Sequence, residues 1–286
     1  MNKSKILAFI NLIKLEHTIF ALPFAYTGYW IGGRGLIRWD DIIWVSIAMV
    51  SARTLGMCLN RIADLKFDKN NPRTSNRPLV TGELSVAFVR NAIIVCFIIF
   101  VIATLQLDPL CLKLLPLAMI PLFAYHYLKR FTLFCHFGIG LVLAFAPLGA
   151  WIAASGSLDK AALFLACAVL FWIAGFDIIY AIQDREFDIK TNLKSIPAKY
   201  GVNGAILVAG VCHLIMFVAL IFVARLSSMG FWFYLGIGVT AFLLMGQHVL
   251  MIKDKSREVG KLFVQINGYL SIAVFVATVA DLGWHF

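Results

Sequence analysis

Charged side chains are scarce in this sequence of 286 residues: Asp, Glu, Lys and Arg make up 14%, whereas 61% of the residues are hydrophobic. Soluble domains carry roughly 25% charged residues, so this scarcity excludes an ordinary soluble protein. The mean hydropathy of +0.87 indicates a membrane protein. The sequence also lacks the alternating pattern of barrel strands, and lipid cannot satisfy an open backbone. Helices are therefore the expected spanning elements.

Long apolar stretches recur along the chain from Thr18 to Asp281. A helix needs about 20 mostly apolar residues to cross a bilayer. The stretches predict an all-helical fold in a single domain, residues 1–286, with nine membrane spans. We expect these spans at residues 18–33, 42–60, 86–106, 109–127, 132–154, 160–182, 203–224, 230–252 and 262–282.

A cleavable secretory signal is not expected at the N-terminus, although Lys3, Lys5 and Lys14 precede the first apolar stretch. No small-residue cleavage pattern follows that stretch, and eight further spans are predicted after it. We expect the first residues to form an uncleaved segment at the membrane surface.

Zinc-binding patterns are also missing. The six cysteines are isolated residues within predicted spans, and there is no Cys-x-x-Cys or helical His pair. We expect His136, His213 and His248 to be packed or hydrogen-bonded. The net charge of +10 does not indicate a nucleic-acid partner, because the cations lie in short loops beside the spans.

The basic residues are distributed unevenly between the two sides of the predicted membrane. Most of the 25 Lys and Arg lie in the N-terminal segment and in the loops after even-numbered spans. The opposite loops hold only Arg34, Arg38, Lys113, Lys160 and Arg225. Because positive loops mark the cytoplasmic side, we expect the acidic loops there, with a bacterial inner membrane as the location.

Acidic residues gather at the ends of the second and sixth spans, in NRIADLKFD and DIIYAIQDREFD. Carboxylates beside hydrocarbon are costly and usually functional. The spacing in each motif places oxygen ligands on one helical face, as hard divalent cations require. The motifs at 60–68 and 177–188 therefore predict a magnesium-held diphosphate, with metal ligands Asn60, Asp64, Asp68, Asp177, Asp184 and Asp188.

Arg53 lies inside a predicted span, on the same helical stripe as Asn60 and Asp64. It is about 16 Å deeper than Asp64 at 1.5 Å per residue. A charged arginine at that depth needs an anionic partner, and no obvious carboxylate is predicted there. We therefore favour a substrate carboxylate, which the guanidinium can bind with two hydrogen bonds, over a structural ion pair. Asn60 could then orient a substrate hydroxyl.

Cations accompany the acidic motifs on the same side of the predicted membrane. Diphosphate oxygens need such partners. The predicted diphosphate contacts are Arg73, Arg77, Lys129 and Lys194, whereas Arg130, Lys190 and Lys199 are expected to serve membrane topology only.

These segments together resemble the UbiA superfamily of intramembrane aromatic prenyltransferases. NRIADLKFD with NPRTSNRPLVTG, then YHYLKRFT, then DIIYAIQDREFD with LKS occur in matching order across nearly the whole chain. The resemblance implies nine helices around a central cavity in the bilayer, a polyprenyl diphosphate donor and two magnesium ions. It adds Tyr125 and Tyr180 to the diphosphate site, assigns Arg53 to an aromatic carboxylate, and gives Asp177 to a metal or to the acceptor.

Two features depart from the family pattern. Arg61 follows Asn60 where many relatives have Asp. Helical spacing turns it away from the acidic stripe, and we expect it to support its neighbours. The segment KLEHTIFALPFAY resembles a subgroup that is less tied to a benzoate acceptor.

The predicted function is transfer of a polyprenyl group to an aromatic carboxylic acid, 4-hydroxybenzoate, in ubiquinone biosynthesis. The catalytic residues are then the five aspartates of the motifs, Asp64, Asp68, Asp177, Asp184 and Asp188. A dihydroxynaphthoate acceptor in menaquinone biosynthesis stays open, because it would satisfy the same arginine. A secondary transporter is the alternative from another class, although its charges would be expected near the membrane midplane. The Asp-Gly and Ala-Arg pattern of an alcohol phosphatidyltransferase is absent.

Overall fold

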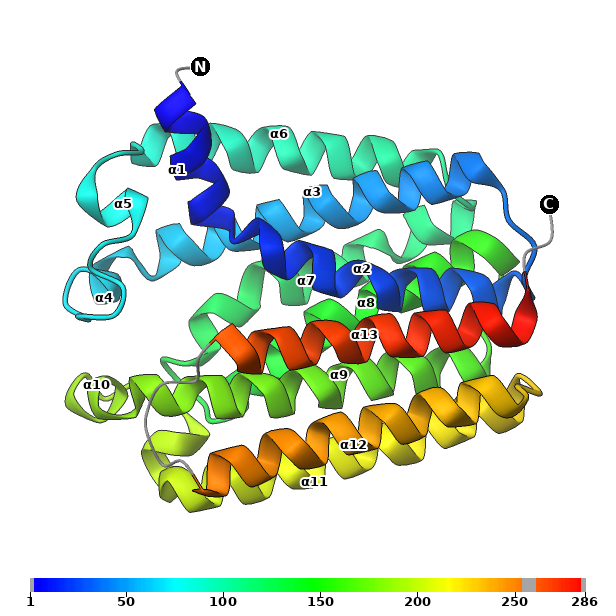
Figure 1. Cartoon of the computed structure of the whole chain (residues 1–286). Coiled ribbons are helices and arrows are strands. Elements are labelled where there is room, and N and C mark those ends of the chain that lie inside the picture. Colours follow the sequence, from blue (N-terminus) through cyan, green and yellow to red (C-terminus); the bar gives the residue numbers. More distant parts are fainter. Residues whose placement is uncertain (1–2, 254–260, 284–286) are drawn as a thin grey trace.

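The structure, a computed structural model, describes residues 3–253 and 261–283, with side chains for residues 4–14, 21–252 and 263–283. Long helices run side by side along most of the molecule (Figure 1). They are α2 (Leu15–Gly32), α3 (Trp39–Ala63), α6 (Val86–Leu105), α7 (Pro109–Leu128), α8 (Cys135–Ser155), α9 (Lys160–Tyr180), α11 (Ile196–Leu226), α12 (Phe231–Lys253) and α13 (Lys261–Leu282).

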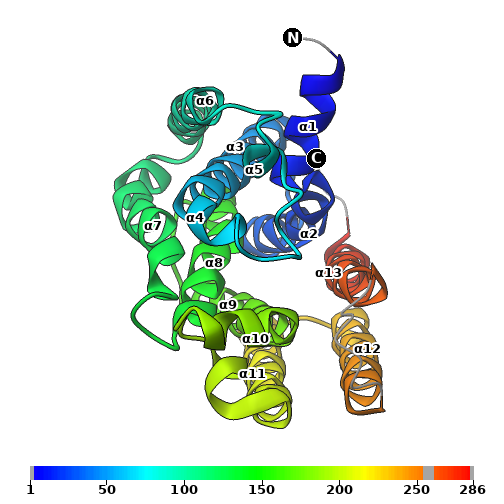
Figure 2. The same ribbon diagram turned by 90° about the vertical axis from the view of Figure 1, so that its left-hand side faces the viewer.

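Short helices lie at one end of this bundle (Figures 1 and 2). They are α1 (Lys3–Ile13), α4 (Leu65–Asp68), α5 (Pro78–Thr81) and α10 (Arg185–Lys190), and a 3₁₀ turn, η1 (Ala181–Asp184), precedes α10. The short helices therefore belong to the loops that the sequence predicts on the cytoplasmic side.

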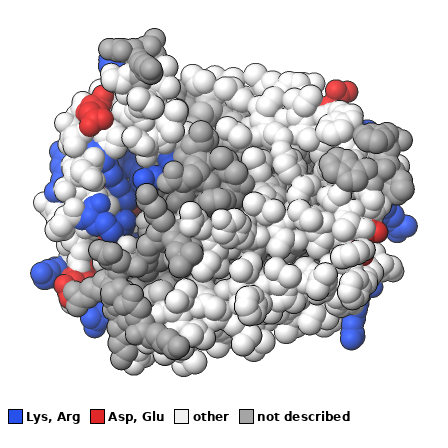
Figure 3. Space-filling model, in the orientation of Figure 1, with Lys and Arg blue, Asp and Glu red and all other residues white. Residues whose placement is uncertain are grey.

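The prediction of an all-helical membrane protein is confirmed, with eight candidate spans in the described residues where nine were predicted. Eight of the described helices are long and apolar enough to cross a membrane: α3, α6, α7, α8, α9, α11, α12 and α13. The remaining predicted span, 18–33, corresponds to α2, which has 18 residues and packs against α8 and α13. The chain is therefore an integral membrane protein. On the face shown in Figure 3, the described surface between the two ends carries almost no charged side chains.

Polar residues fix where several spans begin. The side chains of Ser85, Asp108 and Asp159 accept hydrogen bonds from backbone N–H groups in the first turns of α6, α7 and α9. These caps satisfy donors that the helix itself leaves unpaired. Ser195 caps α11 in the same way.

Close helix packing depends on small residues. A Cβ atom added to Gly28 of α2 would lie 2.2 Å from the carbonyl oxygen of Pro147 in α8. Only glycine permits this approach, which is the usual role of small residues between membrane helices. The contact holds α2 against the helices that surround the apolar cavity described below.

The two acidic motifs do not lie on continuous helices, so the prediction that each forms one helical face is wrong in this respect. Helix α3 ends at Ala63, and Asp64 breaks it with φ −95° and ψ 2° before α4 starts. Helix α9 ends at Tyr180, and Asp184 has φ −94° and ψ 1° before α10 starts. Both aspartates occupy the sparsely allowed bridge region. The two motifs therefore share the same local backbone geometry at these aspartates.

Candidate active site

The two acidic motifs meet at one end of the bundle, where α4 and α10 both lie (Figures 1 and 2). Asp68 from the first motif and Asp184 from the second line one polar cavity of about 100 Å³. Lys and Arg side chains gather on the surface at this end (Figure 3). The other polar residues that line the cavity are Asn60, Asp64, Asn71, Arg73, Thr74, Arg77, His126, Lys129 and Arg130.

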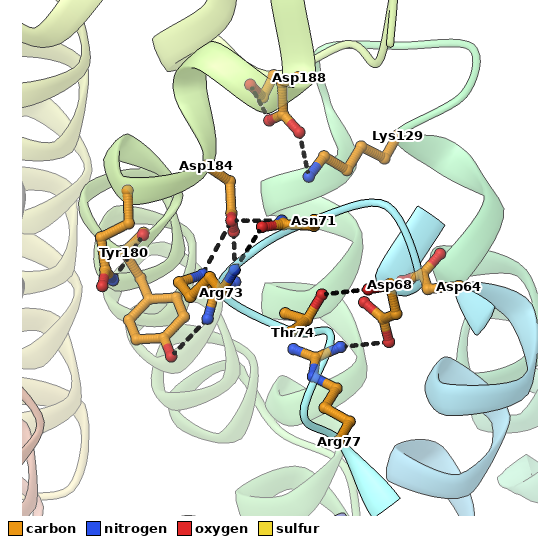
Figure 4. Close-up of polar contacts among 12 residues, drawn as sticks. Asp64, Asp68, Asn71, Arg73, Thr74, Arg77, Lys129, Tyr180, Asp184 and Asp188 are labelled. Carbon is orange, nitrogen blue, oxygen red and sulfur yellow. Dashed lines mark hydrogen bonds and ion pairs between the residues drawn. The ribbon is translucent and has the colours of Figure 1, made fainter. Parts of the chain in front are cut away.

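The loop between α4 and α5 ties the motifs together (Figure 4). Arg73 donates from Nε to Asp184 Oδ1 at 2.9 Å and from Nη2 to Asp184 Oδ2 at 2.5 Å. Asn71 Nδ2 also donates to Asp184 Oδ1, at 3.0 Å. On the other side of the loop, Arg77 Nη1 donates to Asp68 Oδ2 at 2.6 Å. One loop thus contacts an aspartate of each motif.

Lys129 provides the third cation of the site. Its Nζ lies 2.7 Å from Asp188 Oδ1, and the Ser195 hydroxyl donates to Asp188 Oδ2 at 2.8 Å. Asp188 is fully buried. Burial acts to lower the pKa of Lys129, but the Asp188 carboxylate outweighs it and raises that pKa. The lysine therefore remains charged beside the buried carboxylate.

Asp64 differs from these three aspartates because it pairs with no cation in the part of the chain that the structure describes. Asn60 Nδ2 donates to Asp64 Oδ2 at 2.9 Å. Burial and the neighbouring Asp68 raise the pKa of Asp64 to about 6, against the opposing effect of Lys129, Arg130 and Arg77. Both causes act against negative charge, and a bound cation would offset them.

The oxygen atoms of these side chains are of the types that bind magnesium. Carboxylate and amide oxygens are the ligands that this ion prefers. Within residues 3–253 and 261–283, however, no three acidic, His or Cys side chains surround a common point as a metal site requires. Asp68, Asp184 and Asp188 are engaged by Arg77, Arg73 and Lys129 instead. Metal binding would need these carboxylates to exchange partners.

A larger apolar cavity of about 510 Å³ lies next to the polar one. On α7, Leu122 and Tyr125 line the apolar cavity, and Lys129, one turn further along, lines the polar one. On α3, Gly56 and Asn60 follow the same order. The two cavities therefore meet near Tyr125.

Arg53 is the only charged residue among the described residues that line the apolar cavity. Its Nε atom is buried and makes no hydrogen bond to the described side chains or backbone. A buried donor without a partner costs about 1–3 kcal/mol. The arginine is thus available to an anion inside the cavity.

Four predicted site residues line neither cavity: Asp188, described above, and Tyr180, Asp177 and Lys194. The Tyr180 hydroxyl accepts from Arg73 Nη1 at 3.5 Å, and the Arg73 guanidinium lies 5.5 Å from the Tyr180 ring centre. Asp177 Oδ2 is 2.7 Å from Nδ1 of His136. The Lys194 amine donates to Asn192 Oδ1 at 2.9 Å. Asp177 as a metal ligand and Lys194 as a phosphate contact therefore stay predictions.

Several site residues were not predicted. Asn71 and Thr74 lie in the segment NPRTSNRP, of which only the two arginines were predicted to belong to the site. Thr74 donates to the Asp68 carbonyl oxygen. Arg130 was expected to serve topology only, but it donates to the carbonyl oxygen of Ala63 at 2.6 Å, at the C-terminus of α3. Its signal in the sequence was its place directly after Lys129.

The fold and the site are those of a membrane enzyme in which paired acidic motifs lie at the end of an apolar cavity. Residues 21–272 match the UbiA prenyltransferase family, and the chain therefore belongs to this family of enzymes. The predicted family is thus confirmed.

Individual relatives agree with this result. The apo structure of a UbiA homolog from Aeropyrum pernix K1 is 32% identical, has a TM-score of 0.84, and the match covers 93% of this chain and 98% of that one. A UbiA homolog from Archaeoglobus fulgidus bound to GPP and Mg²⁺ is 19% identical with a TM-score of 0.69, covering 96% and 98%. A 4-hydroxybenzoate octaprenyltransferase from Saccharophagus degradans is 28% identical over 282 residues, 98% of this chain and 94% of the relative.

Proposed function

We propose that this enzyme transfers a polyprenyl group from polyprenyl diphosphate to an aromatic carboxylic acid, with 4-hydroxybenzoate as the first candidate. The observation that carries the proposal is the junction of the two cavities. A polar cavity with cations and both acidic motifs adjoins an apolar cavity in which Arg53 is the one charged residue among the described lining residues. This arrangement suits a diphosphate head group, an isoprenoid tail and an anionic acceptor.

The cations are suited to receive the diphosphate. Arg73, Arg77 and Lys129 each form an ion pair with a carboxylate. A bound diphosphate would offer them stronger acceptors, and two hydrogen bonds from one arginine fit its oxygens well. The exchange would release Asp68, Asp184 and Asp188.

The residues that would hold magnesium are Asn60, Asp64, Asp68, Asp184 and Asp188, with Asp177 as a further predicted ligand. When bound, the metal would neutralise charge on the departing diphosphate. Structures of the Archaeoglobus fulgidus homolog with GPP and Mg²⁺ and with DMAPP and Mg²⁺ support the proposal that diphosphate and magnesium bind together.

The chain's own residues promote departure of the diphosphate. Arg73, Arg77, Lys129 and Tyr180 place hydrogen-bond donors where negative charge accumulates, which stabilises the transition state more than the ground state. The apolar cavity excludes water from the allylic carbon, so that the carbon is attacked by the acceptor ring. The ring then loses a proton and regains aromaticity.

Arg53 supports an acidic acceptor. The relatives from Saccharophagus degradans and Vibrio campbellii are named 4-hydroxybenzoate octaprenyltransferases, each 28% identical to this chain. A dihydroxynaphthoate would present the same carboxylate to Arg53, and it remains the second candidate because of KLEHTIFALPFAY. We place the site on the cytoplasmic face of a bacterial inner membrane, as the basic loops indicate.

The test is product formation by purified protein in lipid nanodiscs. The protein is incubated with geranyl diphosphate, Mg²⁺ and a panel containing 4-hydroxybenzoate, a dihydroxynaphthoate and neutral phenols, and products are identified by mass spectrometry. We expect a prenylated acid and released diphosphate, and no product without Mg²⁺. Prenylation of neutral phenols alone would contradict the role of Arg53. Uptake of substrate into vesicles without product would favour a transporter.

A further inference from the structure

Helix α1 lies across the end of the bundle at a steep angle to the spans, on the same side as α4 and α5 (Figure 1). Its inner face packs through Ala8, Leu12 and Ile13 in a cluster with Met57 of α3. The ring of Phe9 meets the ring of Phe88 in α6 edge to face, with centroids 5.7 Å apart. The helix is thus fixed against α3 one turn before the first acidic motif.

Arg61 connects α1 to this motif. Its side chain is buried, with 6% of the residue exposed. Arg61 Nε donates to the carbonyl oxygen of Leu12 at 3.1 Å. Leu12 lies in the last turn of α1, where carbonyl oxygens lack helical partners and attract cations. One arm of the guanidinium is therefore committed to α1.

The other arm reaches the predicted metal ligands. Arg61 Nη1 donates to Asn60 Oδ1 at 3.3 Å, and Asn60 Nδ2 donates to Asp64 Oδ2 at 2.9 Å. An amide side chain has an acceptor at one end and donors at the other, so the bond from Arg61 fixes which end faces Asp64. The contacts form a continuous chain from Leu12 through Arg61 and Asn60 to Asp64.

We propose that Arg61 is a positioning residue that orients the Asn60–Asp64 pair for metal and diphosphate binding, using α1 as its anchor. The proposal rests on the proposed function, because it assigns Asp64 to a bound cation. The positive charge of Arg61 should repel a cation bound at Asp64. A positioning role explains why a buried arginine nevertheless lies there. A planar guanidinium can bond a carbonyl and an amide at once, which an ammonium on a flexible stem does less well.

Charge and position predict opposite effects, which makes the proposal testable. If Arg61 acted on the cation only through its charge, Arg61→Met would remove repulsion and tighten metal binding, and Arg61→Lys would change nothing. If Arg61 positions Asn60 and Asp64, both variants weaken metal binding, on the order of 10-fold for the loss of one charge-assisted hydrogen bond.

The experiment measures metal binding directly. Mn²⁺ is titrated into purified protein with inorganic pyrophosphate, and bound ion is counted by electron paramagnetic resonance. Arg61→Met and Arg61→Lys are compared with Arg90→Met, a matched control at an exposed arginine of α6. We expect both Arg61 variants to bind Mn²⁺ more weakly than wild type and Arg90→Met to bind it equally well. In the Arg61 variants, kcat should recover at saturating Mg²⁺.

Anchoring by α1 is tested with Phe9→Ala, which loosens the helix without touching the site. It should weaken Mn²⁺ binding, and the effects of Phe9→Ala and Arg61→Met should be less than additive, because both break the same chain of contacts. Arg61→Lys and Phe9→Ala keep the test valid if Arg61→Met does not fold.

Unchanged or tighter Mn²⁺ binding in both Arg61 variants, with wild-type turnover intact, overturns the Arg61 proposal and leaves the proposed function standing. Full additivity with Phe9→Ala overturns the role of α1. Wild-type protein that binds no Mn²⁺ overturns both the proposal and the proposed function, because Asp64 would have no cation to hold.

Discussion

Replacement of Lys129 by methionine should change metal and diphosphate binding in opposite directions. The substitution keeps the apolar stem and removes the ammonium group that lies 2.7 Å from Asp188 Oδ1. Asp188 is fully buried, so among the described residues its carboxylate then keeps only the Ser195 hydroxyl as a hydrogen-bond partner, at 2.8 Å. An uncompensated buried carboxylate attracts a divalent cation more strongly and repels a diphosphate.

The size of the effect follows from this environment. Loss of one partner from a fully buried pair costs about 3–5 kcal/mol. The Lys129 side chain is 32% exposed, so solvent weakens its ion pair with Asp188. We therefore expect Lys129→Met to lower the free energy of unfolding by about 1–3 kcal/mol. Mg²⁺ alone should restore much of the lost stability, because it takes the place of the ammonium group.

The assay is thermal unfolding in nanodiscs, with Mg²⁺ alone, pyrophosphate alone, and both. Compared with wild type, Lys129→Met should gain more stabilisation from Mg²⁺ and less from pyrophosphate. Lys190→Met, at an exposed lysine of the same end, is the control and should behave like wild type. A Lys129 variant in which both ligands stabilise less, or both more, would refute the exchange of partners.

Further predictions follow from other contacts. Arg53→Ala should lower kcat/KM for acidic acceptors on the order of 100-fold and spare neutral ones; Thr104→Val, in the same cavity, is the matched control, and equal loss for all acceptors would indicate structural damage instead. Asp64→Ala and Asp184→Ala should each abolish product formation in the mass-spectrometric assay, whereas near-normal rates would remove the metal-site proposal. Gly28→Ala should lower the thermal stability by about 1–3 kcal/mol, because its Cβ would lie 2.2 Å from the Pro147 carbonyl oxygen; an unchanged melting temperature would contradict the close packing of α2 and α8.

The sequence was sufficient to predict the spans, because apolar length alone determines whether a helix can cross a bilayer. It was also sufficient to predict that Asp68, Arg73, Arg77, Lys129 and Asp184 share a site, since their positions relative to the spans place them at one membrane face. The structure brings all five to one polar cavity.

The sequence could not reveal which cation pairs with which aspartate. Arg73 and Asp184 are 111 residues apart, and no local pattern links them. Helical spacing also failed at Asp64 and Asp184, because both adopt a bridge conformation immediately before a short helix, and neither motif is one continuous α-helix. At the first of these breaks Arg130 donates to the Ala63 carbonyl oxygen, a tertiary contact that the local sequence does not reveal.

Arg61 is an intermediate case. Its spacing predicted that it would turn away from the acidic stripe and support its neighbours, and its hydrogen bond to Asn60 agrees with this prediction. Its second partner, the carbonyl oxygen of Leu12, was beyond prediction because backbone acceptors carry no signal in the side-chain sequence.

The most direct test of the account is an experimental structure with Mn²⁺ and an unreactive thio analogue of geranyl diphosphate. Anomalous scattering would locate the metal, and density would locate the tail. We predict metal within about 2.5 Å of oxygens from both Asp64 or Asp68 and Asp184 or Asp188, with the tail in the cavity lined by Arg53 and Tyr125. Metal bound away from these aspartates, or a tail outside that cavity, would contradict the account.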